Sequence, residues 1–437
     1  MMGATRKIGL YLGSRDILQN PGYLEALQRG MGLNLVILGF SGEVPPEVMA
    51  ANPFDGQPPS KERILSLVTR DLDGQPILRK YDSAMHSLGP HTAPGGDDRE
   101  LREAIRRVHA LGIDVWLLAG VWVSSDYDLL MYCPNDEAVN HWYETLFAYI
   151  AANYGVEGLD CTHARYPMLS ELPGLLSCGC ERCARAAASL GYDMPQMIAA
   201  WRAATQALQR LDARYVAELG TLAMGPFDYL QLLGLDRGVA QWFRFRCEVI
   251  ARNVARFPRA VHAAARPGFL YGVDTYPTSL SMFAGHDHTR WAEHSDFASP
   301  LISHVDIFVT KALVSWAQTL QRLIPGLAEP DALRAVHRFT GYDTLSLPTN
   351  YADYALGEPD SEFRHIPLRA LLALDMAKAR LYLPQGLPCY PIIQGGGAPH
   401  LWPREIVDQT MQDAEALGHA GVIFQGTRNM VPFELKS

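Results

Sequence analysis

Short apolar runs that read as β-strands recur along this chain, and segments with helical periodicity separate them. The runs are nearly continuous in apolar residues, which is typical of strands buried on both faces and so of a parallel sheet. Eight such runs predict an α/β fold, the (β/α)8 TIM barrel, as a single domain over residues 1–437. An open doubly wound sheet is the alternative, but no Gly-x-Gly-x-x-Gly follows the first run. The predicted strands are Ile8–Leu12, Leu35–Phe40, Val115–Val121, Gly158–Thr162, Phe269–Thr275, Val305–Thr310, Tyr390–Gln394 and Gly421–Gln425.

The spacing of the predicted strands is uneven and places long insertions after strands 2, 4 and 6. The insertion after strand 4, residues 167–267, combines helical periodicity with a group of cysteines. Helix starts are expected at Asp97-x-x-Glu100, which resembles a capping box, at Pro134-Asn135-Asp136 and at Pro403. Loops at the C-terminal ends of barrel strands are where active sites are built.

The charge balance limits the partners that the chain can have. Lys and Arg number 38 against 47 Asp and Glu, so the net charge is −9. An acidic chain has no general attraction for phosphate backbones or anionic lipid, so neither nucleic acid nor a membrane is an expected partner. The longest apolar run, Val115–Val123, is far shorter than the roughly 20 residues of a membrane span. Without a signal-peptide pattern in Met1–Arg15, a cytoplasmic location is expected.

Three of the seven cysteines lie within six residues, in Cys178-Gly-Cys180-Glu-Arg-Cys183. An odd number with this spacing is not typical of a disulfide framework. Such a turn lets sulfurs converge on a tetrahedral ion, and Cys133 is the best candidate for a fourth ligand. We therefore expect a structural Zn²⁺ on Cys133, Cys178, Cys180 and Cys183, and no organic cofactor. Buried thiols of the core and a redox or iron–sulfur site are the alternatives.

The cysteine pattern resembles a known family. Tyr132-Cys133-Pro134-Asn135 followed by Cys178-x-Cys180-x-x-Cys183 is similar to the zinc cluster of the family 42 glycoside hydrolases, the β-galactosidases of clan A. The segment Val156–Pro167 resembles strand four of uncharacterised glycosidase-like barrels. The resemblance implies a carbohydrate substrate, glycosidase activity and the option of a homo-oligomer.

The sequence departs from that family at both catalytic positions. His163 and Ala164 stand where family 42 has an Asn-Glu pair, and the related barrels have Asp where this chain has Thr162. The end of strand seven, where clan A has its nucleophilic Glu, reads Ile393-Gln394-Gly395-Gly396. A glycosidase of this sequence would need a non-standard set of catalytic carboxylates.

Acidic residues on two predicted strands are the candidates for that set. Asp160 on strand four and Asp274 at the end of strand five are each either functional or held in a salt bridge, because an unpaired carboxylate is costly inside an apolar strand. Asp306 is interpreted as structural. His163 is the third catalytic candidate, as an acid or base near neutral pH.

The remaining candidates would bind the substrate. Arg165 could clamp a hydroxyl or carboxylate in fork geometry, with Tyr166 beside it, although both could instead anchor a loop by hydrogen bonds. Sugar faces stack on aromatic rings, and the predicted set is completed by Trp122, Tyr276, Lys311 and Gln394.

Two other functions are compatible with the sequence. The missing strand-four Glu favours a catalytically inactive barrel that only binds a sugar. Lys311, at the end of predicted strand six, could form a Schiff base in a lyase. Glycoside cleavage by Asp160 and Asp274 is the main prediction, because an inactive barrel has no reason to keep buried charge.

Overall fold

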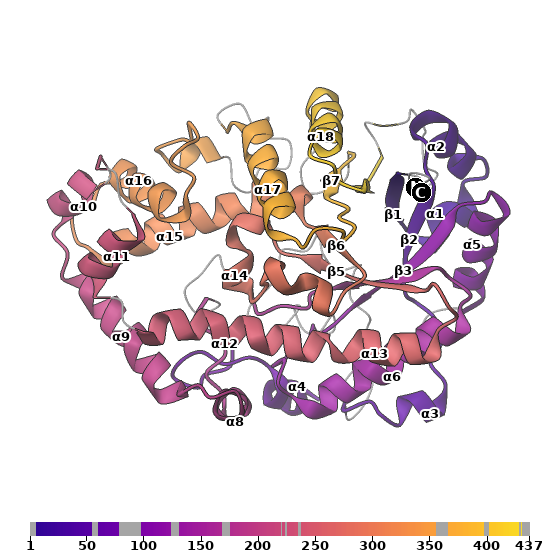
Figure 1. Ribbon diagram of the computed structural model, residues 1–437, viewed down its shortest axis with the longest axis horizontal. Helices are drawn as coiled ribbons and strands as arrows, with labels where there is room; N and C mark the ends of the chain where they lie inside the picture. The colour runs from indigo at the N-terminus through magenta and orange to yellow at the C-terminus, as the bar shows by residue number, and fades with distance from the viewer. Residues whose placement is uncertain are drawn as a thin grey trace.

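Eight parallel strands in the order β6-β5-β4-β3-β2-β1-β8-β7 form the centre of the protein (Figure 1). The computed structural model describes residues 6–54, 60–77, 98–123, 131–167, 175–219, 221–222, 225–234, 237–354, 366–396, 402–427 and 430. The strands are β1 Lys7–Leu12, β2 Leu35–Gly39, β3 Asp114–Gly120, β4 Gly158–Thr162, β5 Leu270–Thr275, β6 Phe297–Pro300, β7 Ile392–Gln394 and β8 Gly421–Gln425.

The two ends of this sheet meet through a single bridge. Ala298 of β6 pairs in parallel with Cys389, just before β7. The Ala298 N–H donates to the Pro388 carbonyl at 2.9 Å, and the Tyr390 N–H donates to the Ala298 carbonyl at 2.9 Å. These bonds close the sheet, so the predicted (β/α)8 barrel is confirmed.

Helices follow the strands and fill the insertions. The first group is α1 Ser14–Gln19, α2 Tyr23–Met31, α3 Pro46–Met49, α4 Lys61–Leu67, α5 Asp98–Ala110 and α6 Glu137–Asn153. The segment after β4 carries α8 Glu181–Ser189, α9 Met194–Gln209, α10 Ala213–Leu219, α11 Pro226–Leu233, α12 Arg237–Val254 and α13 Arg256–Ala264. The last group is α14 Ser281–Ala284, α15 Thr310–Leu323, α16 Glu329–Thr340, α17 Leu368–Tyr382 and α18 Arg404–Ala416.

The predicted helix starts agree with local capping geometry where the structure describes them. Asp136 caps α6, because its Oδ1 accepts from the Val139 N–H at 3.1 Å. Pro403 immediately precedes α18. Asp97 lies outside the described residues, and α5 is described from Asp98.

The prediction of the sixth strand, Val305–Thr310, was wrong. Val305–Val309 is a π-helical turn that leads into α15, and the true sixth strand is the four-residue Phe297–Pro300. Val305, Phe308 and Val309 are all buried, and positions three and four apart share one side of a helix, so this apolar run suits a helix as well as a strand. Lys311 therefore lies in the first turn of α15 and not at a strand end.

An aromatic layer fills the barrel interior. Trp116 of β3 stacks on Phe297 of β6 with ring centroids 4.3 Å apart, and Tyr390 packs edge-on against both rings. Gly158 and Gly272 make room for these rings, since a Cβ at Gly158 would meet Trp116 and a Cβ at Gly272 would meet Phe297. We call these three packed rings the barrel floor.

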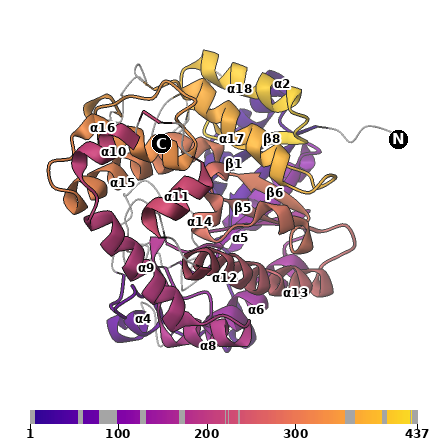
Figure 2. The same ribbon diagram turned by 60° about the vertical axis from the view of Figure 1, so that its left-hand side comes forward.

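The segment after β4 runs as a helical layer along one side of the barrel. Figure 1 shows α12 continuing into α13 along this side, and Figure 2 shows α9 crossing beside α12. α13 packs against α6, whereas α9 packs against α12. No helix within the described ranges is long and apolar enough to cross a membrane.

Candidate active site and cysteine cluster

The carboxyl groups of Asp160 and Asp274 lie within hydrogen-bonding distance of each other inside the barrel. The Tyr11 hydroxyl reaches both, donating to Asp160 Oδ2 at 2.7 Å and lying 3.3 Å from Asp274 Oδ1. The Ser299 hydroxyl donates to Asp160 Oδ1 at 3.4 Å. Asp160 is fully buried and Asp274 is 6% exposed. Four polar side chains from strands β1, β4, β5 and β6 thus form one carboxyl cluster.

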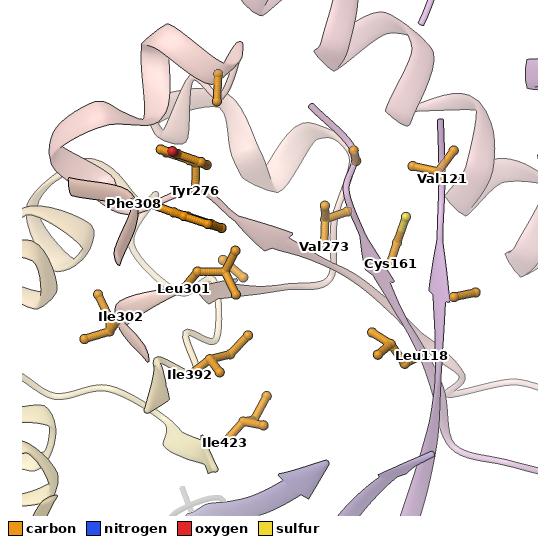
Figure 3. Close-up of a cluster of buried hydrophobic side chains, with 14 of the residues drawn as sticks. Leu118, Val121, Cys161, Val273, Tyr276, Leu301, Ile302, Phe308, Ile392 and Ile423 are labelled. Atoms are coloured by element: carbon orange, nitrogen blue, oxygen red, sulfur yellow. The ribbon is translucent and has the colours of Figure 1, made fainter. Parts of the chain in front are cut away.

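Strand register explains why these side chains meet. Asp160 pairs with Gly272, and Asp274 lies two residues beyond Gly272, so both carboxyls face the same side of neighbouring strands. Asp274 pairs in turn with Ser299. Trp116, in the barrel floor, pairs with Gly158 of β4. Asp160 follows Gly158 by two residues, so the carboxyl cluster lies next to the floor, toward the C-terminal end of β4. Apolar side chains also face this interior, and Figure 3 shows Leu118, Ile392 and Ile423 pointing into it.

Burial controls the ionisation of the pair. Desolvation raises the pKa of Asp160 from its ordinary value near 3.8 to about 6, although the hydrogen bonds from Tyr11, Asp274 and Ser299 oppose the rise. Burial, followed by the neighbouring Asp160 charge, raises the pKa of Asp274 well above its usual range. Burial also raises the pKa of Tyr11, which therefore remains a proton donor. Both pKa values are raised, so burial favours a proton held between the two carboxyl groups over two separate negative charges.

His163 and Arg165 follow β4 directly, as the sequence indicated. His163 has a positive φ of 64° and is buried, and burial followed by the charge of Arg165 lowers its pKa to about 3. Its imidazole is therefore neutral at physiological pH. The Arg165 guanidinium carbon lies 5.4 Å from the centre of the Tyr276 ring and 5.8 Å from that of Phe308. These two rings stack 5.1 Å apart and nearly parallel, as Figure 3 shows.

Gln394 lies on β7 inside the barrel wall. It is fully buried, and its amide nitrogen donates to Gln425 Oε1 at 3.3 Å and to the Ser303 carbonyl at 3.4 Å. Gln425 is its partner in the β7–β8 register.

Trp122 and Tyr166 are packed into the protein. The Trp122 indole N–H donates to Asn140 Oδ1 at 2.7 Å, and the ring is fully buried. Tyr166 is also fully buried, with the Arg246 guanidinium 4.4 Å from its ring centre. Asp306, interpreted as structural from the sequence, accepts from the Trp402 indole N–H at 3.0 Å.

Sequence reasoning missed Tyr11 and Ser299. Tyr11 belongs to a strand that was predicted correctly, so the signal was a hydroxyl-bearing residue near the end of an apolar strand. Ser299 was missed because its four-residue strand is short and ends in proline. Its place in the cluster depends on the pairing of β6 with β5, which the local sequence does not encode.

The four predicted cysteines do come together. The sulfurs of Cys133, Cys178, Cys180 and Cys183 all lie within 4.8 Å of one another, and Cys133 lies 3.5 Å from both Cys180 and Cys183. Four sulfurs about 2.3 Å from a tetrahedral ion would lie about 3.8 Å apart, so the arrangement suits one metal ion. All four side chains are buried.

Two N–H groups point at the sulfurs. The Arg70 backbone N–H donates to Cys178 Sγ at 3.2 Å, and the Asn135 amide donates to Cys183 Sγ at 3.3 Å. Such bonds stabilise thiolate charge and orient metal ligands. Between the first two cysteines of the turn, a Cβ at Gly179 would meet the Asp71 carbonyl oxygen at 2.8 Å. The Cys-Gly-Cys spacing therefore lets this turn pack closely on the insertion after β2.

Comparisons with known proteins find similar solved structures but no sequence family. No model of a protein family matches the chain, and no curated protein matches it either. The glycoside hydrolase domain of PgaB (BpsB) from Bordetella bronchiseptica is 11% identical, with a TM-score of 0.45, over 97% of this chain and 94% of that chain. Alpha-L-fucosidase isoenzyme 2 from Paenibacillus thiaminolyticus is 13% identical, with a TM-score of 0.42, over 98% of this chain and 47% of that chain. The chitinase RmChi1 from Rhizomucor miehei is 10% identical, with a TM-score of 0.39, over 97% and 95%. The barrel assignment rests on this chain's own strand order, and the resemblance to family 42 stays a prediction.

Proposed function

We propose that this protein is a glycoside hydrolase-like barrel that cleaves a carbohydrate with Asp274 as proton donor and Asp160 as its ionised partner. The observation that carries the proposal is the direct contact of these two carboxyl groups, under the Tyr11 hydroxyl, on adjacent barrel strands. Active sites of such barrels lie at the C-terminal ends of the strands, and Asp274 is the next-to-last residue of β5. Asp274 is also the more exposed of the two carboxyls.

The chemistry follows from one shared proton. Asp274 donates its proton to the glycosidic oxygen while the bond from that oxygen to the anomeric carbon breaks. A water molecule adds its oxygen to the anomeric carbon, and its released proton returns to the carboxyl pair. Asp160 stabilises the protonated form of Asp274 before the reaction and accepts charge-assisted hydrogen bonds afterwards.

The spacing of the pair argues against the usual two-carboxylate arrangements. Retaining glycosidases separate their carboxyls by about 5 Å and inverting ones by about 6.5–9.5 Å, so that the sugar carbon or a water fits between. Carboxyls that bond to each other leave no such gap. We therefore assign Asp160 a supporting role and no covalent step.

Residues after β4 and around the barrel mouth would bind the sugar. Arg165, held against the Tyr276 ring, would donate to substrate hydroxyls, and neutral His163 would accept or donate one hydrogen bond. Lys311 and Gln394 are assigned to the same role. The hydrogen bond of Trp122 to Asn140 and the contact of the Tyr166 ring with Arg246 favour a packing role for those two side chains.

The experiment is a panel of chromogenic glycosides tested with the wild type, Asp160→Asn, Asp274→Asn and a matched control. Asp375→Asn is that control, because Asp375 is a fully buried acid on α17 that accepts from the Tyr342 hydroxyl at 3.0 Å. Activity lost in the first two variants and kept in the third supports the proposal. Sugar binding without turnover in the wild type would instead identify the inactive sugar-binding barrel.

The position of Lys311 no longer favours the lyase alternative. Lys311 was considered because it was expected to end a barrel strand, but it lies in the first turn of α15. Borohydride trapping of a carbonyl substrate remains a direct test, and a covalent adduct on Lys311 would replace the hydrolase proposal.

We further propose that Cys133, Cys178, Cys180 and Cys183 hold a structural Zn²⁺. Four thiolate donors complete a tetrahedral site and leave no position for water, which is the arrangement of structural zinc. The ion would tie the start of α6 to the segment 167–267, which we interpret as a helical insertion within a single barrel domain.

A further inference from the structure

A cavity of about 270 Å³ lies at the end of the protein opposite β1 and β2. It is partly open and is lined by residues of the insertion after β4, chiefly on α9 to α12, together with residues of α15 and α16. Figure 1 shows these helices at the same end of the protein. The bulky side chains in its wall are Trp201, Phe243, Phe283, Trp316, Leu320 and Phe339. None of its lining residues belongs to the carboxyl cluster.

Thr205, Thr319 and Arg338 in this wall have partners within the chain, whereas the Trp201 indole N–H has none among the described residues. The Thr205 hydroxyl donates to the Trp201 carbonyl at 3.0 Å, and the Thr319 hydroxyl donates to the Ser315 carbonyl at 2.8 Å. Arg338 donates to Asp343 at 3.2 Å, so its charge is neutralised. The interior therefore presents almost only hydrocarbon.

Water is a poor occupant of such a space. A buried water needs two to four polar partners, and an apolar cavity of about 150 Å³ lined by Leu, Ile and Phe stays dry and binds benzene or xenon. The present cavity is larger and has a similar lining. An apolar molecule would recover dispersion contacts that the wall otherwise lacks.

The helices around the cavity also expose apolar side chains to solvent. Phe227 on α11 is 82% exposed, and Tyr215, Leu222, Leu230 and Phe339 are 44–54% exposed. Tyr229 and Phe339, both of which line the cavity, stack edge-on at 5.5 Å. The approach to the cavity is thus apolar, which favours capture of an apolar molecule from a carrier or assembly.

We propose that this cavity is a second binding site, specific for the hydrocarbon chain or ring of an uncharged molecule. Among the described lining residues the one charged side chain, Arg338, is paired with Asp343, which argues against a phosphate. The same residues offer too few hydrogen-bonding groups for a sugar. The site is independent of the carboxyl cluster, so it does not depend on glycoside cleavage.

The test uses xenon, bromobenzene and 1-bromohexane with the full chain. Xenon under pressure should give a peak in a crystal between Trp201 and Trp316, and the bromine probes should quench tryptophan fluorescence in a saturable way. Ala204→Phe and Ala335→Leu add side chains from opposite walls, and each should weaken bromobenzene binding about tenfold or more. Two separate variants keep the test valid if one of them does not fold.

Phe227→Ser is the matched control, since Phe227 is exposed on α11 but does not line the cavity. It should leave bromobenzene affinity unchanged. Loss of binding in Phe227→Ser with retention in both filled variants would place the probes on the outer surface and overturn the proposal. So would a xenon-derivatised crystal with no peak in the cavity.

Discussion

The Tyr11 hydroxyl donates a 2.7 Å hydrogen bond to Asp160, although the two residues are 149 positions apart in the chain. The same hydroxyl lies 3.3 Å from Asp274, so one phenol from β1 spans the barrel interior to both acids on β4 and β5. A buried carboxylate is stable only with such donors. Tyr11 is therefore a positioning residue for the carboxyl pair, and it offers the first test.

Replacing Tyr11 by Phe should raise the pKa of Asp160 above its value of about 6, because the lost hydrogen bond favours the ionised form. The acidic limb of a pH–rate profile, or a ¹³C-carboxyl titration followed by NMR, should move to higher pH. Tyr342→Phe is the matched control, as Tyr342 is a buried tyrosine that donates to Asp375 elsewhere. An unchanged titration in Tyr11→Phe would show that the phenol does not support Asp160.

Asp160 should make the protein less stable as the pH rises from about 4 to about 6. Its pKa is raised in the folded state, so the folded chain binds more protons than the unfolded chain in this window. Asp160 stabilises the folded state fully below its unfolded pKa, and this stabilisation is lost as the pH rises through about 6. The loss in the free energy of unfolding is about 3 kcal/mol at most. Urea unfolding of Asp160→Asn across this range should lack that component, whereas Asp375→Asn should retain it.

Buried histidines should act in the opposite direction and make acid destabilising. Burial lowers their pKa values below 6.5 in the folded state, to about 3 for two of them and about 4 for the others. These residues are His163, His286, His288, His294, His304, His337 and His419. Below pH 6.5 the unfolded chain binds more protons than the folded chain. Each histidine that is protonated only in the unfolded chain lowers the free energy of unfolding by about 1.4 kcal/mol per pH unit.

The free energy of unfolding should therefore fall steeply from pH 6.5 toward pH 4, measured by urea titration at several pH values. His337→Gln should reduce the slope of the unfolding free energy against pH by about 1.4 kcal/mol per pH unit, which corresponds to one proton. A stability that stays flat over this range would contradict the neutral, buried state of these side chains.

Removal of metal should destabilise the protein. A chelator applied to the purified chain should lower the melting temperature by roughly 5 °C or more, because binding energy at a structural site contributes to folding. Cys180→Ser should have the same effect and should abolish zinc binding measured by elemental analysis. Cys389→Ser is the control, since Cys389 is buried but lies outside the cluster. A wild-type protein that keeps its melting temperature after the metal is removed would contradict a structural role for the ion.

Gly272→Ala should be destabilising by about 3 kcal/mol or more, because the added Cβ would collide with the Phe297 ring in the barrel floor. Gly225→Ala serves as the control, as its nearest neighbour would be an Asp228 carboxyl oxygen at 3.7 Å and its φ is −110°. Chemical denaturation of the two variants gives the comparison. Equal stabilities would mean that the floor can adjust to the methyl group.

The sequence by itself determined the barrel, because the signals for its strands and helices are local. Apolar runs mark the strands, apolar residues at helical spacing mark the helices, and capping residues mark where helices begin. Seven of the eight strands lie within two residues of their predicted positions, and the cysteine spacing predicted the sulfur cluster. Local patterns failed at Val305–Val309, where an apolar run suits a helix as well as a strand, and they could not reveal Ser299.

Only the tertiary structure decided how the two acids are arranged. Asp160 and Asp274 were identifiable as costly charges in apolar strands, but their mutual hydrogen bond and their contact with Tyr11 depend on the register of strands far apart in the chain. The same holds for the apolar cavity, whose wall is assembled from α9, α12, α15 and α16. Pairwise distances between such segments follow from packing, and no local period in the sequence specifies them.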